Sequence, residues 1–215
     1  MRDLFQPIAL KMSKRVPLHE CLPAICDLLS YLRCNSTVEL SAWHPLGFVL
    51  FKLGSVEGLG SLRLHVWPDK DRRPQYPYWS IHNHMWDLNS HILCGAATNE
   101  IYDIKQSEGN HQFYRVSYEG NNSILERTGR RLACQLGSSI TYGRGEYYVV
   151  EGDIYHATKV AAETFTATLV LTTEAKKAAP TVVGDWNGNS KYIYARRMCN
   201  RREFSKLLDQ VLSQI

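Results

Sequence analysis

The chain has 215 residues, of which 44% are hydrophobic, an ordinary composition for one folded domain with a sizeable core. Its 25 Lys and Arg residues exceed its 21 Asp and Glu residues by four. A net charge of +4 is too small to indicate a nucleic-acid-binding protein, so no nucleic-acid partner is expected.

The N-terminus and the cysteines both indicate a cytoplasmic location. Residues 1–16 interrupt their apolar residues with Asp3, Gln6, Lys11 and Lys14, which leaves neither a signal peptide nor a membrane-spanning stretch. The six cysteines include no CxxC pair, which argues against a zinc ribbon and, in a reducing compartment, against a disulfide framework. We therefore expect a cytoplasmic protein with mostly buried thiols and no membrane partner.

Two segments, one near each end of the chain, carry apolar residues at steps of three and four. They cover about residues 17–33 and about residues 202–214, and this spacing predicts two amphipathic helices. Residues 176–190, which contain Pro180, Gly184 and Gly188, predict a long connection to the second helix.

Between the two helices the sequence has the pattern of a β-rich domain. Short runs of Val, Ile, Tyr, Phe and Thr alternate with glycines. The candidate strands are residues 47–53, 61–67, 79–84, 92–94, 100–104, 112–118, 131–140, 147–150, 156–160 and 164–173. So many short antiparallel strands predict an all-β barrel, closed or in two sheets, because complete pairing leaves no exposed edge. We expect a single domain over residues 1–215, with a barrel core at about residues 43–174.

Three histidines stand in positions that suit a metal ion. His82 and His84 lie two residues apart in a predicted strand, so their side chains point to the same face. His156 follows a turn at residues 151–153 and begins another predicted strand. If the fold brings these two strands together, three nitrogens face one ion and leave coordination positions open for substrate and for dioxygen or water.

The same residues resemble the two motifs of the cupin superfamily. The triplet His82-Asn83-His84 followed by Gly95 resembles the first motif, and Gly145 leading through residues 151–155 to His156 resembles the second. The resemblance covers about residues 43–174 and implies a cupin-type double-stranded β-helix barrel. The usual proline of the second motif is missing, and no Glu follows His84 at the expected distance. The resemblance therefore implies a three-histidine centre unless Asp87 takes the place of that Glu.

Among three-histidine cupins, the chain is most similar to thiol dioxygenases of the cysteine dioxygenase type. Ser80-Ile81-His82-Asn83-His84 followed by Ser90-His91 matches their first motif with about three extra residues. Ile92 stands where the animal enzymes have a cross-linking cysteine. The resemblance implies a mononuclear non-haem oxygenase or oxidase, with Fe2+ as the expected metal and Ni2+, Mn2+ or Zn2+ as possible ones. Its substrates would be dioxygen and a small thiol or amino acid such as cysteine.

Further residues are candidates for substrate binding and catalysis. A carboxylate taken out of water needs a cation, and Lys52 and Arg63 lie on the two predicted strands before the histidine triplet. Tyr155 is a candidate to offer its phenol to bound oxygen. His91 is a catalytic candidate, but its offset of seven from His84 favours the opposite face of the strand, with a place beside the ligands or in the core.

The remaining histidines and two rival functions complete these expectations. His19, His44, His65 and His111 are single, and a surface or hydrogen-bonded role is expected for them. One rival function is a metal cupin that acts without oxygen as an isomerase, lyase or hydrolase. The other is a non-enzymatic cupin that binds a small molecule. Nothing in the sequence fixes the oligomeric state.

Overall fold

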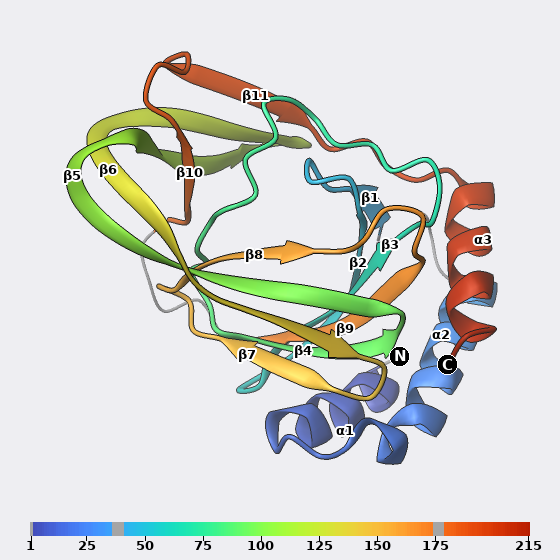
Figure 1. Ribbon diagram of the computed structural model, residues 1–215. Helices are drawn as coiled ribbons and strands as arrows, with labels where there is room; N and C mark the ends of the chain where they lie inside the picture. Colours follow the sequence, from blue (N-terminus) through green and yellow to red (C-terminus); the bar gives the residue numbers. More distant parts are fainter. Residues whose placement is uncertain (1, 36–40, 174–178) are drawn as a thin grey trace.

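The computed structural model describes residues 2–35, 41–173 and 179–215 (Figure 1). The helices are α1 (Arg2–Ser13), the short 3-10 helix η1 (Leu18–Glu20), α2 (Leu22–Asn35) and α3 (Arg201–Leu212). The strands are β1 (Ser41–Trp43), β2 (Val49–Val56), β3 (Gly60–Trp67), β4 (Leu88–Cys94), β5 (Ala96–Glu119), β6 (Asn122–Gly143), β7 (Tyr147–Val150), β8 (Tyr155–Lys159), β9 (Thr166–Thr172), β10 (Thr181–Asp185) and β11 (Lys191–Ala195). None of these helices is both long and apolar enough to cross a membrane.

The described strands form two antiparallel sheets. The first has the order β1-β2-β3-β9-β4-β7, and the second has the order β10-β5-β6-β11 with β8 paired to β5. The long strands β5 and β6 make one hairpin that sweeps along the left side of the view in Figure 1. The predicted mostly-β architecture with flanking helices is therefore confirmed. The finer assignment to a double-stranded β-helix barrel stays a prediction from the two motifs.

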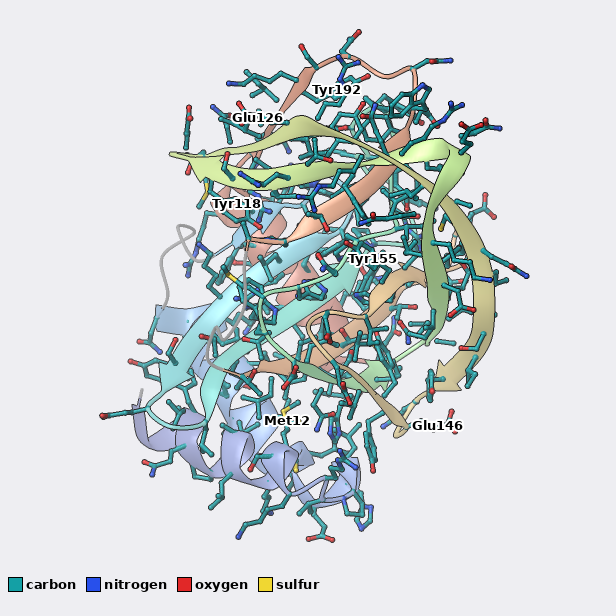
Figure 2. All side chains as sticks on the ribbon, turned by 90° about the vertical axis from the view of Figure 1, so that its left-hand side faces the viewer. Met12, Tyr118, Glu126, Glu146, Tyr155 and Tyr192 are labelled. Carbon is teal, nitrogen blue, oxygen red and sulfur yellow. The ribbon has the colours of Figure 1, made fainter. Side chains whose placement is uncertain are left out.

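The helices cover the outer face of the first sheet and form the main hydrophobic core there. Leu62 and Leu64 of β3 pack in this core with Ile25 of α2 and Phe204 of α3, and all four are almost fully buried. Asn200 caps the N-terminus of α3: its side chain accepts a hydrogen bond from the Glu203 amide in a capping box. Figure 2 shows Met12 of α1 where the helix meets the sheet. This core fixes the sheet that carries one wall of the site.

The opposite face of the same sheet turns toward the second sheet. Because side chains alternate along a strand, Arg63 and His65 of β3 point away from the helices. They line a cavity that is closed on the other side by residues of the second sheet, such as Val116 and Ser123. The first sheet thus has an apolar core on one face and a cavity on the other.

Several elements differ from those expected from the sequence. The helix α1 was not expected, because the polar residues that exclude a signal peptide are distributed around a buried stripe of Phe5, Ile8 and Met12. The helix expected at residues 17–33 is divided between η1 and α2. The predicted connection at residues 176–190 contains β10, and β11 follows it; both extend the second sheet beyond residue 174.

The expected strand at residues 79–84 is an extended segment with only isolated bridges at His82. The strands expected at residues 100–104 and 112–118 are parts of the single strand β5. Local residue patterns locate such elements, but pairing between distant segments decides their bounds.

Candidate metal centre and its cavity

The extended segment that carries His82 and His84 lies between β8 and β10. The amide of His82 donates to the carbonyl of His156 at 3.0 Å, and the His156 amide donates back to His82 at 2.9 Å. On the other side, the Val183 amide donates to the carbonyl of Ile81 at 2.8 Å. These bonds keep the segment extended without a regular strand, so the side chains of His82 and His84 still point to one side.

Three imidazole rings meet at this point. The metal-binding nitrogens of His82, His84 and His156 lie within 4.8 Å of one another. The Nε2 atoms of His84 and His156 are 3.0 Å apart, and the ring centroids of His82 and His84 are 4.6 Å apart. Among the described residues, no Asp, Glu or Cys belongs to this group. The sequence-predicted triplet is therefore brought together, as a three-histidine cluster that can hold a metal ion of unassigned identity.

Hydrogen bonds behind the rings orient two of the three ligands. The Nδ1 atom of His82 lies 2.7 Å from the Ser80 carbonyl, and the Nδ1 atom of His156 lies 2.8 Å from the Asn99 side-chain oxygen. Both oxygens accept, so each Nδ1 carries the hydrogen and each Nε2 keeps its lone pair. Burial lowers the pKa of all three histidines, and the neutral imidazole is the form that binds metal. The donor set thus fits a divalent ion such as iron, nickel, manganese or zinc.

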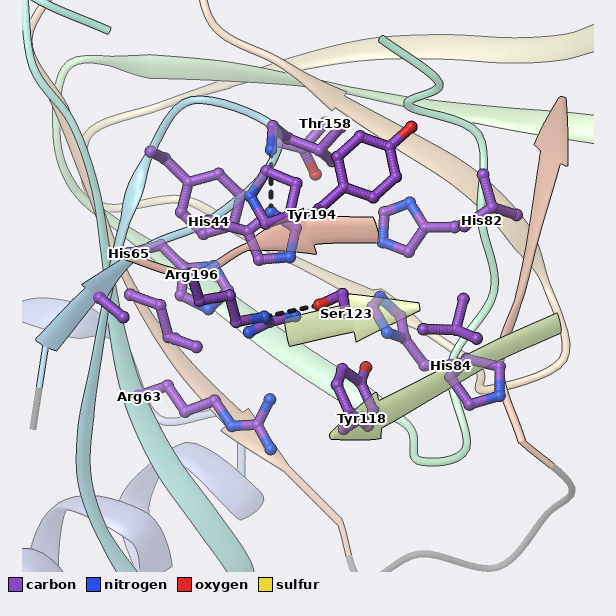
Figure 3. Close-up of a pocket in the computed structure, with 18 of the residues that line it drawn as sticks. His44, Arg63, His65, His82, His84, Tyr118, Ser123, Thr158, Tyr194 and Arg196 are labelled. Carbon is purple, nitrogen blue, oxygen red and sulfur yellow. Dashed lines mark hydrogen bonds between the residues drawn. The ribbon is translucent and has the colours of Figure 1, made fainter. Parts of the chain in front are cut away.

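The cluster lies on the wall of a cavity of about 460 Å³ between the two sheets (Figure 3). Three cationic side chains line it, those of Lys52, Arg63 and Arg196. No Asp or Glu is found among the described residues that line it. A cavity with cations and without carboxylates favours an anionic ligand.

Two further histidines line this cavity, although the sequence predicted ordinary roles for them. His44 stacks on Phe48, with ring centroids 4.4 Å apart, and its Nδ1 accepts a hydrogen bond from the Leu46 amide at 3.2 Å. Burial lowers the pKa of His65 to about 3 and that of His44 well below its usual range. Both rings are therefore neutral at pH 7. In the sequence, the strict alternation of β3 was the only signal that could have placed His65 beside Arg63.

The predicted substrate residues and catalytic residues have different places. Lys52 and Arg63 line the cavity. Tyr155 lies outside the lining, with its hydroxyl 2.6 Å from the Thr181 hydroxyl. His91 is buried on the helix-facing side of β4, stacked on Tyr147. A catalytic role for Tyr155 or His91 stays a prediction that this geometry does not favour.

Asp87 serves the backbone instead of the metal cluster. Its Oδ1 atom accepts a hydrogen bond from the Gly152 amide at 2.9 Å. Gly152 itself packs closely against the chain, because an added Cβ would lie 2.9 Å from the His84 carbonyl oxygen. This contact holds the turn before His156 against the segment that carries His84. The side chain of Asp87 therefore positions the two halves of the cluster.

Comparisons with known proteins give distant similarities. No family model and no curated protein matches the chain. The DMSP lyase DddQ from Ruegeria pomeroyi DSS-3 is similar at 16% identity with a TM-score of 0.35, over 62% of this chain and 50% of that one. The chain thus spans about half the length of that lyase. Pac13 from Streptomyces, a nucleoside dehydratase, is similar at 10% identity with a TM-score of 0.32, over 78% of this chain and 93% of that one. Membership of the cupin superfamily therefore stays a prediction from the motifs.

Proposed function

We propose that this chain is a metal-dependent enzyme that converts a small anionic organic molecule in the cavity between its two sheets. The observation that carries the proposal is the position of the three-histidine cluster on the wall of a cationic cavity without a described carboxylate. Three protein ligands leave coordination positions open, which is the arrangement of a catalytic site and not of a closed structural one. A cavity of about 460 Å³ lies within the range of small-molecule sites.

Different residues of the cavity would bind the metal, bind the anionic group of the substrate and exclude water. A divalent ion on His82, His84 and His156 would supply Lewis-acid activation of an oxygen, nitrogen or sulfur atom of the substrate. Arg63 and Arg196 offer charged hydrogen-bond donors to an anionic group. Trp86 and the other aromatic side chains give the cavity apolar walls that exclude water from the bound molecule.

The reaction class that this site supports best is proton transfer without oxygen, as in an elimination, a dehydration or an isomerisation. Such reactions need a group that accepts a proton from carbon or oxygen, and a neutral imidazole within the cavity provides one. His65 lines the cavity, and its imidazole ring has no described hydrogen-bond partner. Burial lowers its pKa to about 3, so the ring is neutral at pH 7 and becomes an effective base only when a bound anion beside it raises that pKa. We assign it the role of proton acceptor.

The thiol oxygenase suggested by the motifs is the second candidate. Three neutral ligands leave the full charge of a ferrous ion, and open positions suit a chelating thiol substrate together with dioxygen. Arg63 would then bind the carboxylate of that substrate. No observation in the structure favours dioxygen over water as the second reactant, so this candidate ranks behind the oxygen-independent one.

One experiment separates the two candidates. Metal-loaded protein is incubated with a panel of β-substituted carboxylates and, separately, with cysteine, cysteamine and 3-mercaptopropionate, each with and without oxygen. We expect an unsaturated or isomerised product, seen by NMR, that forms equally well without oxygen. Product formation that requires oxygen, with matching oxygen uptake on a thiol, would establish the oxygenase instead. A protein that binds members of the panel and converts none of them would be a non-enzymatic binding protein.

The role of His65 has its own test. Replacing His65 with Gln keeps a polar side chain of similar length but removes the proton acceptor. We expect turnover to fall by about 10²- to 10⁴-fold while the metal content stays at the wild-type level. Equal turnover in the two proteins would remove His65 from the mechanism.

A further inference from the structure

Two arginines from opposite sheets converge on one part of the cavity. Arg63 belongs to β3 of the first sheet, and Arg196 follows β11 of the second. The guanidinium of Arg196 lies 5.2 Å from the ring centroid of Tyr118, a half-exposed residue at the end of β5. Figure 3 shows Arg63 and Arg196 on the side of the cavity away from His82, with Tyr118 between the arginines and His84 in this view. Because Tyr118 is about half-exposed, this part of the cavity wall reaches the surface of the molecule (Figure 2).

Neither arginine is paired with a carboxylate in the described part of the chain. Arg196 donates from Nε to the Ser123 hydroxyl at 2.8 Å, which orients the guanidinium and leaves its two terminal nitrogens without a described acceptor. The side chain of Arg63 makes no described hydrogen bond, and its guanidinium lies over Trp86, 4.4 Å from the ring centroid. Burial lowers the pKa of both guanidinium groups, and the charge of Arg196 lowers that of Arg63 further.

Other arginines of the chain show the contrast. Arg73 and Arg197 both donate to the Glu203 carboxylate, at 2.8 and 2.7 Å. Arg72 donates to the backbone carbonyls of Pro68, Val160, Ala161 and Thr164. Two partly buried guanidinium groups that repel each other and lack such acceptors are costly in free energy, unless a ligand brings the missing negative charge.

We infer that Arg63, Arg196 and Tyr118 form a second subsite of the cavity that binds a dianionic oxyanion group, such as the phosphate of a phosphorylated substrate. Two guanidinium groups provide more donors than a single carboxylate can accept, whereas the dianion of a phosphate monoester has three terminal oxygens that share two negative charges. This inference rests on the proposed function in one respect, because it assigns the group to the substrate of the metal centre.

The subsite and the metal cluster share one wall. Trp86 contacts Arg63 on one side and also stacks with His84, whose ring centroid is 5.9 Å away. A substrate held by its dianionic group at the arginines would therefore extend along Trp86 toward the metal. The end that reaches the three histidines would be the reacting end.

The test uses inorganic phosphate as the probe, with malonate and acetate as the other two arms. Binding is measured by calorimetry at low ionic strength, because salt screens such contacts. The full chain is used both as purified and after removal of metal with a chelator. We expect phosphate to bind the metal-free protein. Arg63→Met and Arg196→Met should each lower the affinity for phosphate about tenfold or more. Arg115→Met, an exposed arginine of β5 outside the cavity, is the matched control and should bind as the wild type does.

The outcomes separate the possible ligands and the two proposals. Tighter binding of malonate than of phosphate would support the subsite and assign it to a dicarboxylate. Equal binding of acetate and phosphate, or equal phosphate affinity in wild type and Arg63→Met, would overturn the inference. If Arg196→Met does not fold, Ser123→Ala frees the Arg196 guanidinium and should weaken phosphate instead. Because phosphate binding is measured on metal-free protein, the result does not depend on whether the three histidines bind a metal.

Discussion

On β3, Leu62 and Leu64 point toward the helices and are almost fully buried, whereas their neighbours Arg63 and His65 point into the cavity. The same contrast recurs on β9, where Leu169 and Leu171 join the main core and Thr172 lines the cavity. The first sheet therefore separates the hydrophobic core, which stabilises the fold, from the cavity, which carries the candidate metal centre. Burial of apolar surface on the helix side stabilises the fold by about 25 cal/mol per Å². This stabilisation offsets the free-energy cost of the charged and polar groups held on the cavity side.

This division of the first sheet predicts different effects for substitutions on its two faces. Substitutions on the helix-facing side should change the free energy of unfolding and leave ligand and metal binding intact in the folded protein. Substitutions on the cavity side should do the reverse. The predictions that follow run from the largest expected effect to the smallest.

The largest change in the free energy of unfolding is expected at Leu64 of β3, in comparison with its neighbour His65. Leu64→Ala removes a fully buried side chain from the core, and we expect it to lower the free energy of unfolding by about 2–5 kcal/mol. His65→Ala, one residue away on the cavity side, should cost less than half as much. Urea unfolding of the two variants measures both values. A larger loss for His65→Ala would show that the cavity side also carries the stability of the fold.

His91 offers a test on the helix-facing side of β4. Its two ring nitrogens have no described hydrogen-bond partner, and burial lowers its pKa to about 4. The unfolded chain binds more protons between pH 4 and its own pKa of about 6.5, so this histidine lowers stability as the pH falls through that window. Its contribution is at most about 3 kcal/mol, is absent at neutral pH, and is fully developed below pH 4.

The variant His91→Leu should remove this contribution. At pH 7 we expect equal or slightly higher stability than wild type, because the unpaired nitrogens are removed from the core. As the pH is lowered, the variant should lose less stability than the wild-type protein. Unfolding curves from pH 7 to pH 4 measure the difference. Parallel pH dependence of the two proteins would place the ring of His91 in contact with water.

Asn99 tests the hydrogen bond behind a metal ligand. Its side-chain oxygen accepts from Nδ1 of His156, so Asn99→Ala frees that ring to turn or change tautomer. We expect metal affinity to fall by about 10- to 100-fold. Asn99→Asp keeps an acceptor at this position and should hold affinity near the wild-type value. Competition with a metal-binding dye measures all three proteins, and equal affinity in Asn99→Ala would show that the bond does not orient the ligand.

The sequence predicted the metal cluster better than its surroundings. The two-residue spacing of His82 and His84 survives in any extended segment, so the prediction did not depend on a regular strand. His156 was recognised through its turn with Gly152. These are local features, and a single sequence displays them.

The other half of the cavity depends on contacts between distant segments. Arg63 and Arg196 meet because β3 and β11 lie in different sheets that face each other, and the connection before β11 contains the unexpected strand β10. His44 and His65 show no shared motif in the sequence, and only the folded chain brings both to the cavity wall. Tyr155 was expected to face bound oxygen, but its hydroxyl contacts that of Thr181 instead. Thr181 belongs to β10, which lies beyond the barrel core expected from the sequence.

The most direct test of the metal centre is the metal content of the folded protein. Elemental analysis is carried out on wild type, His156→Ala and the control His111→Ala, a histidine of β5 outside the cavity. We expect close to one divalent ion per chain in wild type and in His111→Ala, and little or none in His156→Ala, because one of only three protein ligands is lost. A folded wild-type protein that takes up no metal, or full occupancy in His156→Ala, would contradict the three-histidine centre.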